Sequence, residues 1–593
     1  MEPAQNEDEF KLLRVLSSAH SILDSSFSSK NDEDDTLYLN HMISDDFKFI
    51  ETSQDLRYKS EILLKLKYII RKWVSSLTDT LNININTNEN PDKMKFFKGD
   101  LLPFGSYKLQ CYTRDSDIDT VCIVPNFIKR EEHFFGLLFE ILSQNNKVND
   151  LIAIKETTVP LIKMKFYDVQ IDILFAQLNT MFLEQSIEEI ISSEKIYNLI
   201  DDEKSLTSIN GIRTCSAILK AVPNVNNFQE TLKYVKLWAK NKGIYSNLMG
   251  YLGGISWAIL VAKICQLYPN YKPSKLLERF FMIYYRWEWE ELSVKIEEID
   301  ENVKAQYILK LNFLKDPWID GSEKYFMNIL IPCFPFKNSS YSVTGITLKM
   351  IKYHFEEAVV ILSKIKQGLV DWKVLFEKYN FFMNFTKFIK INIHEKKNGE
   401  TLEKNEKKVE NEDFLKWKGI VESKLRKLSK LLETNIINTF LDICLYPTAF
   451  YSNDKNLKNS IFYYYGLRIK PSYVVETHEN SKFINFMPLI SWFIENLERG
   501  ERIPQQMSIE ITLVKYSKIE KKHIRELENN RFLINGFQNK MMKNQIKNER
   551  GKLYYDNDYF KKSFYSDKMM NDLGDVGVQN SIFSLKKKLK HIF

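Results

Sequence analysis

The sequence contains few cysteines and no long uninterrupted apolar run. Its six cysteines occur singly, and their spacing indicates neither a zinc site nor a disulfide framework, which favours a reducing compartment. The most apolar stretch, residues 251–268, contains Lys263 and is too short to cross a bilayer. We expect a buried helix there.

The first ten residues lack the features of a signal peptide, since MEPAQNEDEF is acidic and polar. A strong excess of one charge is also absent, because the formal net charge is only +7 over 593 residues. Such a balance permits a polyanionic partner but does not require one. We therefore expect a soluble intracellular protein that does not associate with a membrane.

Core-forming residues, in contrast, are plentiful. Hydrophobic residues make up 44% of the chain and aromatic residues 13%, which is ample for buried cores and excludes a disordered chain. A length of 593 residues is too great for one compact core and suggests about three or four domains.

Apolar periodicity predicts a mixed architecture. Residues 53–74 repeat at helical spacing and predict an amphipathic helix that extends towards Leu81, and residues 181–290 are mostly helical in pattern. A strand-like section starts at residues 101–109, and a second mixed region begins near residue 360. The further strand candidates are residues 118–124, 152–154, 161–166, 169–175, 385–393, 462–469 and 507–514, with helices at 131–143 and 417–432.

Three segments have the composition of loosely ordered chain. Residues 1–50 are polar and predict a short helix and loose chain, and residues 395–413 consist mainly of Lys, Glu and Asn, as expected of a solvated, mobile insertion. Residues 537–593 return to low order and end in the basic cluster 586–590.

One cluster of motifs points to phosphate and metal chemistry. Phe104-Gly105-Ser106 predicts a turn at a helix start, where backbone amides and a hydroxyl can face a phosphate. Asp117 and Asp119 are two residues apart on a predicted strand, so their side chains share one face. Mg²⁺ is typically bound by a few carboxylates together with phosphate oxygens, and this face could supply the carboxylates.

A third carboxylate, Asp172, stands alone in the apolar strand 169–174, where an unpartnered charge is costly and a bound metal would explain it. Taken singly, each motif has a simpler explanation: two carboxylates in a turn usually form a solvated loop, and a lone Asp can form a cap or an ion pair. Their order along the chain is that of the polymerase-β-type nucleotidyltransferase superfamily. We place Asp115 in the turn rather than in the metal set.

Several longer segments resemble eukaryotic nuclear poly(A) polymerases. They are residues 234–270 (YVKLWAKNKGIYSNLMGYLGGISWAILVAKICQLYPN), 159–166, 171–176, 209–214, 280–289 and 417–428, and the resemblance runs from about residue 53 to about residue 520. It implies an α+β protein of three domains around a cleft: a nucleotidyltransferase palm, a helical middle domain and a carboxyl-terminal domain like an RNA-recognition motif.

On this basis we divide the chain into five parts. They are an amino-terminal extension (1–52), the palm (53–205), the helical central domain (206–364), an RNA-binding domain (365–525) with the charged insertion 395–413, and a basic tail (526–593).

The resemblance also implies a set of nucleotide contacts. The matching positions are Phe104, Gly105, Ser106, Thr113, Asn210, Lys236, Tyr245, Asn247, Gly254 and Ile255. In the family Lys236 would bind the triphosphate, and Lys163 matches a position near the RNA primer. Without the resemblance, Lys236 would pass for a solvated lysine and Tyr245 for a core aromatic. The chain departs from the family at Asp115 and at Thr158, where the family has a small residue and an aromatic.

Basic residues of the carboxyl-terminal domain are candidates for RNA phosphate contacts. Lys424 and Arg426 follow Trp417 on one predicted helix, and Lys515 ends a late strand. Such contacts give affinity that depends on salt and not on base sequence. The alternative is that all three are ordinary surface charges.

The predicted function is template-independent addition of AMP from ATP to the 3′-hydroxyl of mRNA by a two-metal mechanism. Two Mg²⁺ ions, or Mn²⁺ in their place, would be held by Asp117, Asp119 and Asp172. Another RNA-tailing enzyme, such as a terminal uridylyltransferase, and a non-catalytic RNA-binding scaffold remain as alternatives.

The expected partners are ATP, an RNA 3′ end, and cleavage and polyadenylation factors. We predict a monomer located in the nucleus, and the lysine-rich cluster 586–590 is a candidate import signal.

Overall fold

The structure is a computed structural model of the whole chain. It describes residues 31–83, 95–114, 116–155, 157, 159–296, 325–395, 412–434, 441–451, 460–469, 486–500 and 507–528. Asp115, Thr158, the basic cluster 586–590 and nearly all of the predicted insertion 395–413 lie outside these residues, so the predictions about them stay predictions.

The palm is built around a five-stranded mixed sheet of order β2-β3-β6-β5-β4. Its strands are β2 (Asp100–Pro103), β3 (Ile118–Val124), β4 (Val148–Ile154), β5 (Leu161–Phe166) and β6 (Val169–Gln177). Only β3 and β6 run parallel, and the other neighbours are antiparallel. A separate pair joins β1 (Lys95–Phe96) to β7 (Phe182–Leu183).

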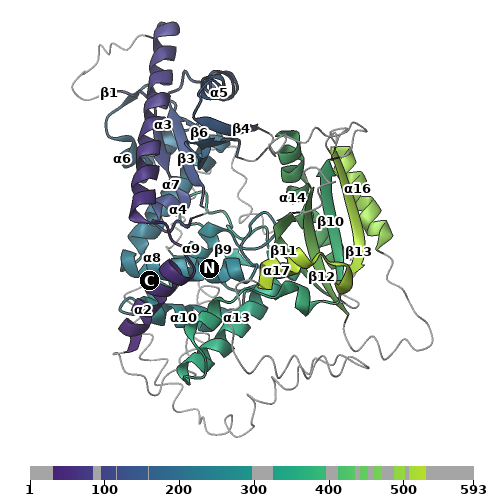
Figure 1. The fold of residues 1–593 in the computed structure, drawn as a ribbon. Coiled ribbons are helices and arrows are strands. Elements are labelled where there is room, and N and C mark those ends of the chain that lie inside the picture. The colour runs from purple at the N-terminus through teal and green to yellow at the C-terminus, as the bar shows by residue number, and fades with distance from the viewer. Residues whose placement is uncertain are drawn as a thin grey trace, which may run out of the picture.

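Both faces of the palm sheet are covered, which explains why β3 is apolar on both sides. The long helix α3 (Ser53–Thr80), with η2 (Arg130–Leu138) and α5 (Phe139–Ser143), packs on one face (Figure 1). On the other face lie α6 (Ile187–Ser192), η3 (Glu194–Asn198) and α7 (Glu203–Ala221). The short helix α4 (Gly105–Lys108) lies between β2 and β3.

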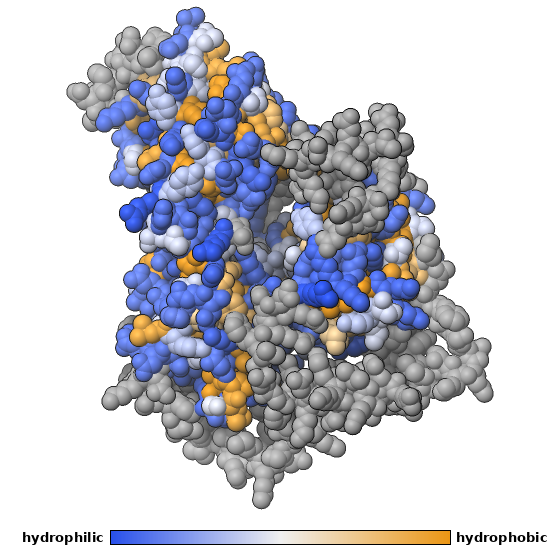
Figure 2. Space-filling view, viewed as in Figure 1, coloured by the Kyte–Doolittle hydropathy of each residue, from blue (hydrophilic) through white to orange (hydrophobic). Residues whose placement is uncertain are grey.

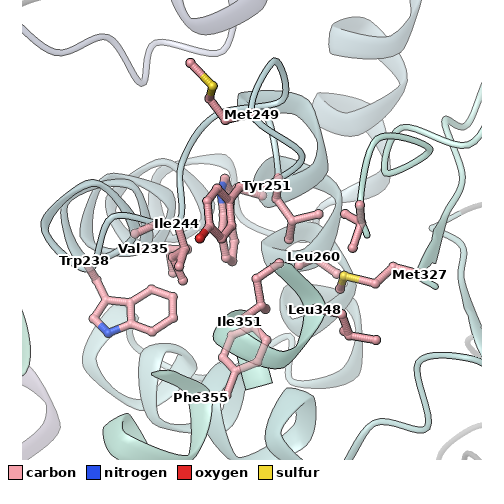
Figure 3. Close-up of a cluster of buried hydrophobic side chains, with 14 of the residues drawn as sticks. Val235, Trp238, Ile244, Met249, Tyr251, Leu260, Met327, Leu348, Ile351 and Phe355 are labelled. Carbon is pink, nitrogen blue, oxygen red and sulfur yellow. The ribbon is translucent and has the colours of Figure 1, made fainter. Parts of the chain in front are cut away.

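The central region is helical, as predicted. It contains α8 (Val225–Asn241), α9 (Gly254–Leu267), α10 (Pro273–Arg286) and α13 (Gly345–Lys366), with the short strands β8 (Ser293–Val294) and β9 (Asn328–Ile329). Figure 3 shows its core, where Trp238 and Phe355 lie near the aliphatic side chains of α9 and α13. The rings of Trp238 and Phe355 stack with centroids 5.6 Å apart.

The carboxyl-terminal domain has the element order of a ferredoxin-like fold. Its elements are β10 (Lys387–Glu395), α14 (Glu412–Leu432), β11 (Leu441–Tyr451), β12 (Ser460–Ile469), α16 (Met487–Gly500) and β13 (Met507–Lys515). The sheet is antiparallel with order β11-β12-β10-β13. This is the topology expected of a domain like an RNA-recognition motif.

Both faces of this second sheet are buried. Helices α14 and α16 cover one face, and η4 (Trp372–Phe376) lies beside the same core. The 3₁₀ helix η5 (Phe381–Asn384) and α17 (Lys521–Glu528), reached through η7 (Tyr516–Lys518), cover the other face. His523 of α17 is fully buried there and lies 3.0 Å from the hydroxyl of Tyr464. RNA-recognition motifs stack bases on their open sheet face, and this face is closed.

The amino-terminal segment packs more tightly than the predicted loose chain. Helix α2 (Asn31–His41) and the π-helical turn η1 (Met42–Asp46) place Leu39, Met42 and Ile43 in the core of the central region. The hydroxyl of Tyr234 donates to Asn40 Oδ1 at 2.8 Å, and Trp372 Nε1 donates to Asp35 at 3.2 Å. This segment therefore belongs structurally with the central helices, although it precedes the palm in sequence.

Most predicted elements are confirmed, and three corrections are needed. The predicted strand-like section 101–109 is a strand only to Pro103, because Gly105 starts α4. The pattern missed β11 and α16 altogether, and it placed the start of the second mixed region within α13. All six cysteines are free and buried, and no helix among the described residues has the length and apolar character to cross a bilayer.

Candidate active site

The register of the palm sheet brings the predicted metal ligands together. The parallel pairing of β3 with β6 sets Asp119 beside Asp172, and Asp117 immediately precedes β3. The antiparallel pairing of β5 with β6 sets Lys163 on the other side of Asp172. The Lys163 ammonium lies 3.0 Å from Asp172 Oδ2 and 3.2 Å from Asp117 Oδ2. Thus three carboxylates and one lysine form a single cluster.

This cluster contains more negative charge than its single lysine can balance. Burial, together with the charges of Asp172 and Asp117, raises the pKa of Asp119 to about 7. Burial also raises the pKa of Asp172, whose Oδ1 is buried and has no hydrogen-bond partner among the described residues. The carboxylates raise the pKa of Lys163 although burial opposes this, so the lysine stays charged.

These residues fit a hard divalent cation in chemistry and charge. Ionised carboxylates are oxygen donors of the kind that Mg²⁺ takes, and the unpartnered Asp172 oxygen marks a place where positive charge is missing. As the side chains lie here, no three acidic, histidine or cysteine side chains of the described chain are arranged as a ready-made metal cage. The Lys163 ammonium lies between two of the three carboxylates instead.

The predicted Gly-Ser turn lies directly against this cluster. Gly105 begins α4 with a φ of +61°, and a side chain there would collide with the Asp119 carboxylate. The Phe104 amide donates to the Asp119 carbonyl oxygen at 2.9 Å. The Phe104 ring lies on Gly211 of α7, where an added Cβ would come within 2.7 Å of it. Two glycines thus allow the loop to pack between β3 and α7.

A cavity of about 580 Å³ opens beside the loop and contains most of the predicted nucleotide contacts. The predicted residues that line it are Phe104, Gly105, Ser106, Thr113, Asp117, Asp119, Asn210, Lys236, Tyr245, Gly254 and Ile255. The predicted residues that do not line it are Asp172, Lys163, Asn247, Lys424, Arg426 and Lys515.

Two lysines of α8 form the cationic wall of this cavity. Lys236 is buried and donates to the Cys111 carbonyl oxygen at 2.8 Å, and burial lowers the pKa of its ammonium group. Lys240, one turn further on, donates to Thr113 Oγ1 at 3.1 Å and lies 5.7 Å from the centre of the Tyr245 ring. The Tyr245 hydroxyl faces Gly254, where a Cβ would come within 2.7 Å.

Two asparagines were predicted as nucleotide contacts, and the structure separates them. Asn210 on α7 lines the cavity, is 5% exposed, and its buried Oδ1 has no partner among the described residues. Asn247 lies outside the cavity lining, and its Oδ1 accepts a 2.6 Å hydrogen bond from Ser342 Oγ. Asn210 is therefore the one with an acceptor free for a ligand.

The three basic candidates in the carboxyl-terminal domain lie on two different elements. Lys424 and Arg426 lie on α14, and the Arg426 guanidinium lies 5.5 Å from the centre of the Tyr341 ring. Lys515 is the last residue of the edge strand β13, opposite Lys387. Figure 2 shows a hollow between the palm and central region on one side and the carboxyl-terminal domain on the other.

Sequence reasoning missed part of the cavity wall. Lys240, Thr207, Ile331, Pro335 and Lys337 all line the cavity. Lys240 could have been found, since it is four residues from Lys236 on a predicted helix and so lies on the same face. The loop 331–337 has no motif that distinguishes it from other Pro-containing turns.

Two consecutive stretches of the chain match models of one family. Residues 25–222 match the poly(A) polymerase nucleotidyltransferase domain, and residues 227–378 match the poly(A) polymerase central domain. Together these matches cover the palm and the central helices, including every residue that lines the cavity.

Similar proteins have been described in a plant and a slime mould. Nuclear poly(A) polymerase 4 of Arabidopsis thaliana is 35% identical over 385 residues, which are 65% of this chain and 48% of the relative. The poly(A) polymerase of Dictyostelium discoideum is 31% identical over 474 residues, 79% of this chain and 54% of the relative. The chain spans about half the length of these curated relatives. A solved structure of the RNA terminal uridylyl transferase Cid1 is 15% identical, with a TM-score of 0.40, over 58% of this chain and 99% of that chain.

Proposed function

Because the chain belongs to the poly(A) polymerase family, we propose that it is a template-independent polynucleotide adenylyltransferase, which adds AMP from ATP to the 3′-hydroxyl of mRNA. The observation that supports this most directly is the cluster of Asp117, Asp119 and Asp172, of which Asp117 and Asp119 line a cavity with a cationic wall. The cavity has the acidic groups for a metal-dependent transfer and the basic groups for a triphosphate.

Asp117, Asp119 and Asp172 would hold two Mg²⁺ ions, or Mn²⁺ in their place, which when bound would favour ionisation of the RNA 3′-hydroxyl and neutralise the leaving pyrophosphate. Lys236, with Ser106 and the amides at the start of α4, would bind the ATP phosphates. Tyr245, Asn210, Gly254 and Ile255 would position the rest of the nucleotide. Lys163 would meet the reacting end of the RNA, since its ammonium already lies among the carboxylates.

Extension assays with single nucleotides test this proposal. An oligo(A) primer is incubated with Mg²⁺ and with ATP, UTP, CTP or GTP separately, and the Asp172→Ala variant controls for contaminating activity. We expect efficient extension with ATP alone and none with the variant. Preferential extension with UTP would assign the chain to another class of tailing enzyme, and no extension with any nucleotide would leave only a binding role.

We further propose that the protein acts in the nucleus as a monomer, together with cleavage and polyadenylation factors. Three relatives from Arabidopsis thaliana are named nuclear poly(A) polymerases, which supports the location. A fluorescent fusion of the full chain should be nuclear, and the same fusion without residues 585–593 tests whether the cluster 586–590 directs import. A wholly cytoplasmic full-length fusion would contradict the proposed location.

A further inference from the structure

One wall of the nucleotide cavity is a tight loop whose geometry is fixed from within. The loop, residues 331–337, is closed by a hydrogen bond from the Ile331 amide to the Lys337 carbonyl oxygen at 3.1 Å. Behind it the Asn338 side chain, 7% exposed, accepts from the Ile329 and Ser340 amides and donates to the Met327 carbonyl oxygen at 2.8 Å. Such a buried amide, bonded through both its oxygen and its nitrogen, holds a loop in one conformation.

The loop is also attached to the elements on the palm side of the cavity. The Tyr197 hydroxyl donates to the Phe334 carbonyl oxygen at 3.0 Å, and the two rings pack edge to face. At the end of the loop, the Lys337 ammonium lies 3.4 Å from Glu203, the first residue of α7. Both side chains of this ion pair are partly exposed, 38% for Lys337 and 50% for Glu203.

The position of Lys337 along the cavity follows from the residues of helix α7 that line it. One face of α7 presents Thr207, Asn210, Gly211 and Thr214 to the cavity, in that order from its amino-terminal end. Thr214 is at the deep end, because its neighbour Cys215 contacts the Gly105 carbonyl oxygen in the Gly-Ser turn. Glu203 precedes Thr214 by eleven residues, which is about 16 Å along the helix axis.

Lys337 is therefore at the outer end of the cavity, and the cations Lys236 and Lys240 line its wall near Thr113. A nucleotide whose triphosphate lies at the Gly-Ser turn has no phosphate near Lys337. The other polyanion in the reaction is the RNA strand, and its backbone has a charge at every residue. Glu203 is the one ion-pair partner of Lys337 among the described residues. The ammonium can exchange this exposed carboxylate for a phosphate, since exposed ion pairs contribute little.

We propose that Lys337 binds a backbone phosphate of the RNA near its 3′ end, and that Glu203 holds the ammonium in place until the RNA arrives. This inference rests on the proposed function, because it requires RNA as the polymer that is extended. It adds a primer contact on the central region of the chain, separate from the catalytic cluster and from α14.

Primer affinity measured without catalysis tests the proposal. Binding of a fluorescent oligo(A) to the full chain is followed by anisotropy in the absence of ATP, at several salt concentrations, for the wild type, Lys337→Ala and Lys337→Arg. We expect Lys337→Ala to weaken binding several-fold and to reduce the slope of log affinity against log salt by about 0.7, as for one lost single-strand phosphate contact. Lys337→Arg should keep both values, and the KM for ATP should not change in either variant.

The matched control is Lys272→Ala. Lys272 forms a similar exposed ion pair, 3.5 Å from Glu33, at the start of α10, and its loss should leave primer binding unchanged. Glu203→Gln should keep or strengthen primer binding, because it frees the Lys337 ammonium.

An unchanged salt slope in Lys337→Ala would overturn the proposal, as would an increase in the KM for ATP without any loss of primer binding. A wild type that binds oligo(A) but does not extend it would contradict the proposed function and leave the Lys337 result valid. The two failures are therefore distinguishable.

Discussion

At the scale of single residues, the cluster of three aspartates places negative charge where burial makes it unfavourable. The Lys163 ammonium pairs with Asp117 and Asp172 but not with Asp119, whose pKa is raised to about 7 mainly by burial. A buried carboxylate without a full set of partners costs free energy whenever it is ionised. The protein therefore keeps a destabilising group at the position where a cation would bind.

The Asp119→Asn variant separates these two roles. The amide removes the buried charge, so we expect a melting temperature that is unchanged or higher, by about 2–4 °C for each kcal/mol gained. Extension of oligo(A) should fall to background. Calorimetry and the extension assay on the same preparation measure both effects. A variant that is much less stable than the wild type would indicate that Asp119 is structural.

A second buried residue predicts how stability depends on pH. His354 is fully buried, its Nδ1 lies 3.0 Å from Glu357 Oε2, and the ammonium of Lys242 lies 3.1 Å from the same carboxylate. Burial lowers the pKa of His354, whereas Lys242 and His354 lower the pKa of Glu357 to about 2. The histidine is thus neutral in the folded protein at pH values where the unfolded chain binds a proton.

The unfolding free energy should therefore fall as the pH drops below about 6.5, the pKa of an unperturbed histidine. Above that value the His354 contribution should be constant. Denaturant unfolding between pH 7.5 and 5.5, compared for the wild type and His354→Asn, isolates this contribution. The difference between the two proteins should shrink towards the acidic end. A difference that does not depend on pH would show that His354 titrates normally.

At the scale of elements, close contact between a helix and the loop before it determines the shape of the proposed nucleotide cavity. Gly254 is the first residue of α9, and its missing side chain leaves room for the Tyr245 hydroxyl. In Gly254→Ala the new methyl group would lie 2.7 Å from that oxygen, so the tyrosine must move. We expect the KM for ATP to rise several-fold while primer affinity stays unchanged.

Gly419→Ala is the control for this change. Gly419 lies within α14 and has no atom within 4 Å of an added Cβ, so alanine should stabilise the helix by up to about 1 kcal/mol and leave catalysis unchanged. Equal kinetic effects of the two substitutions would remove Gly254 from the nucleotide site.

Element prediction from the sequence succeeded where one local pattern was sufficient. The strands 118–124 and 161–166 were predicted to the residue, because the first is rich in β-branched residues and the second alternates between buried and partly exposed positions. Strand β11 was missed because Pro447 and an irregular register between Tyr446 and Phe450 obscure its periodicity. The loop 331–337 could not be predicted, since its conformation depends on Asn338 and on Tyr197, which is more than 130 residues away.

Prediction of the site from the sequence likewise succeeded only where a local pattern was sufficient. The three aspartates and the Gly-Ser turn were identifiable from spacing. The position of Lys163 between Asp117 and Asp172 follows from the pairing of β5 with β6, and spacing alone does not show which strands pair. Lys515 was grouped with Lys424 and Arg426 by charge, and the structure places it on a different element, the edge strand β13 instead of α14.

At the scale of the whole molecule, the three predicted domains do not have three separate cores. The central helices, the carboxyl-terminal sheet and the amino-terminal segment 31–46 share one continuous core, which includes Trp238, Trp417 and Met42. The palm has a core of its own between α3 and the sheet. Tyr251 connects the central region to the carboxyl-terminal sheet, because its hydroxyl donates to the Leu445 carbonyl oxygen at 2.7 Å.

This arrangement predicts two unfolding units and not three. Ile70→Ala, in the core of the palm, should lower the midpoint temperature of one calorimetric transition, since truncating a buried isoleucine to alanine costs about 2–5 kcal/mol. Trp417→Ala in α14 and Phe355→Ala in α13 should both lower the midpoint temperature of the other transition, although the two residues lie in different predicted domains. Separate transitions for the last two variants would contradict a shared core. A common shift would show that the carboxyl-terminal domain and the central helices unfold as one unit.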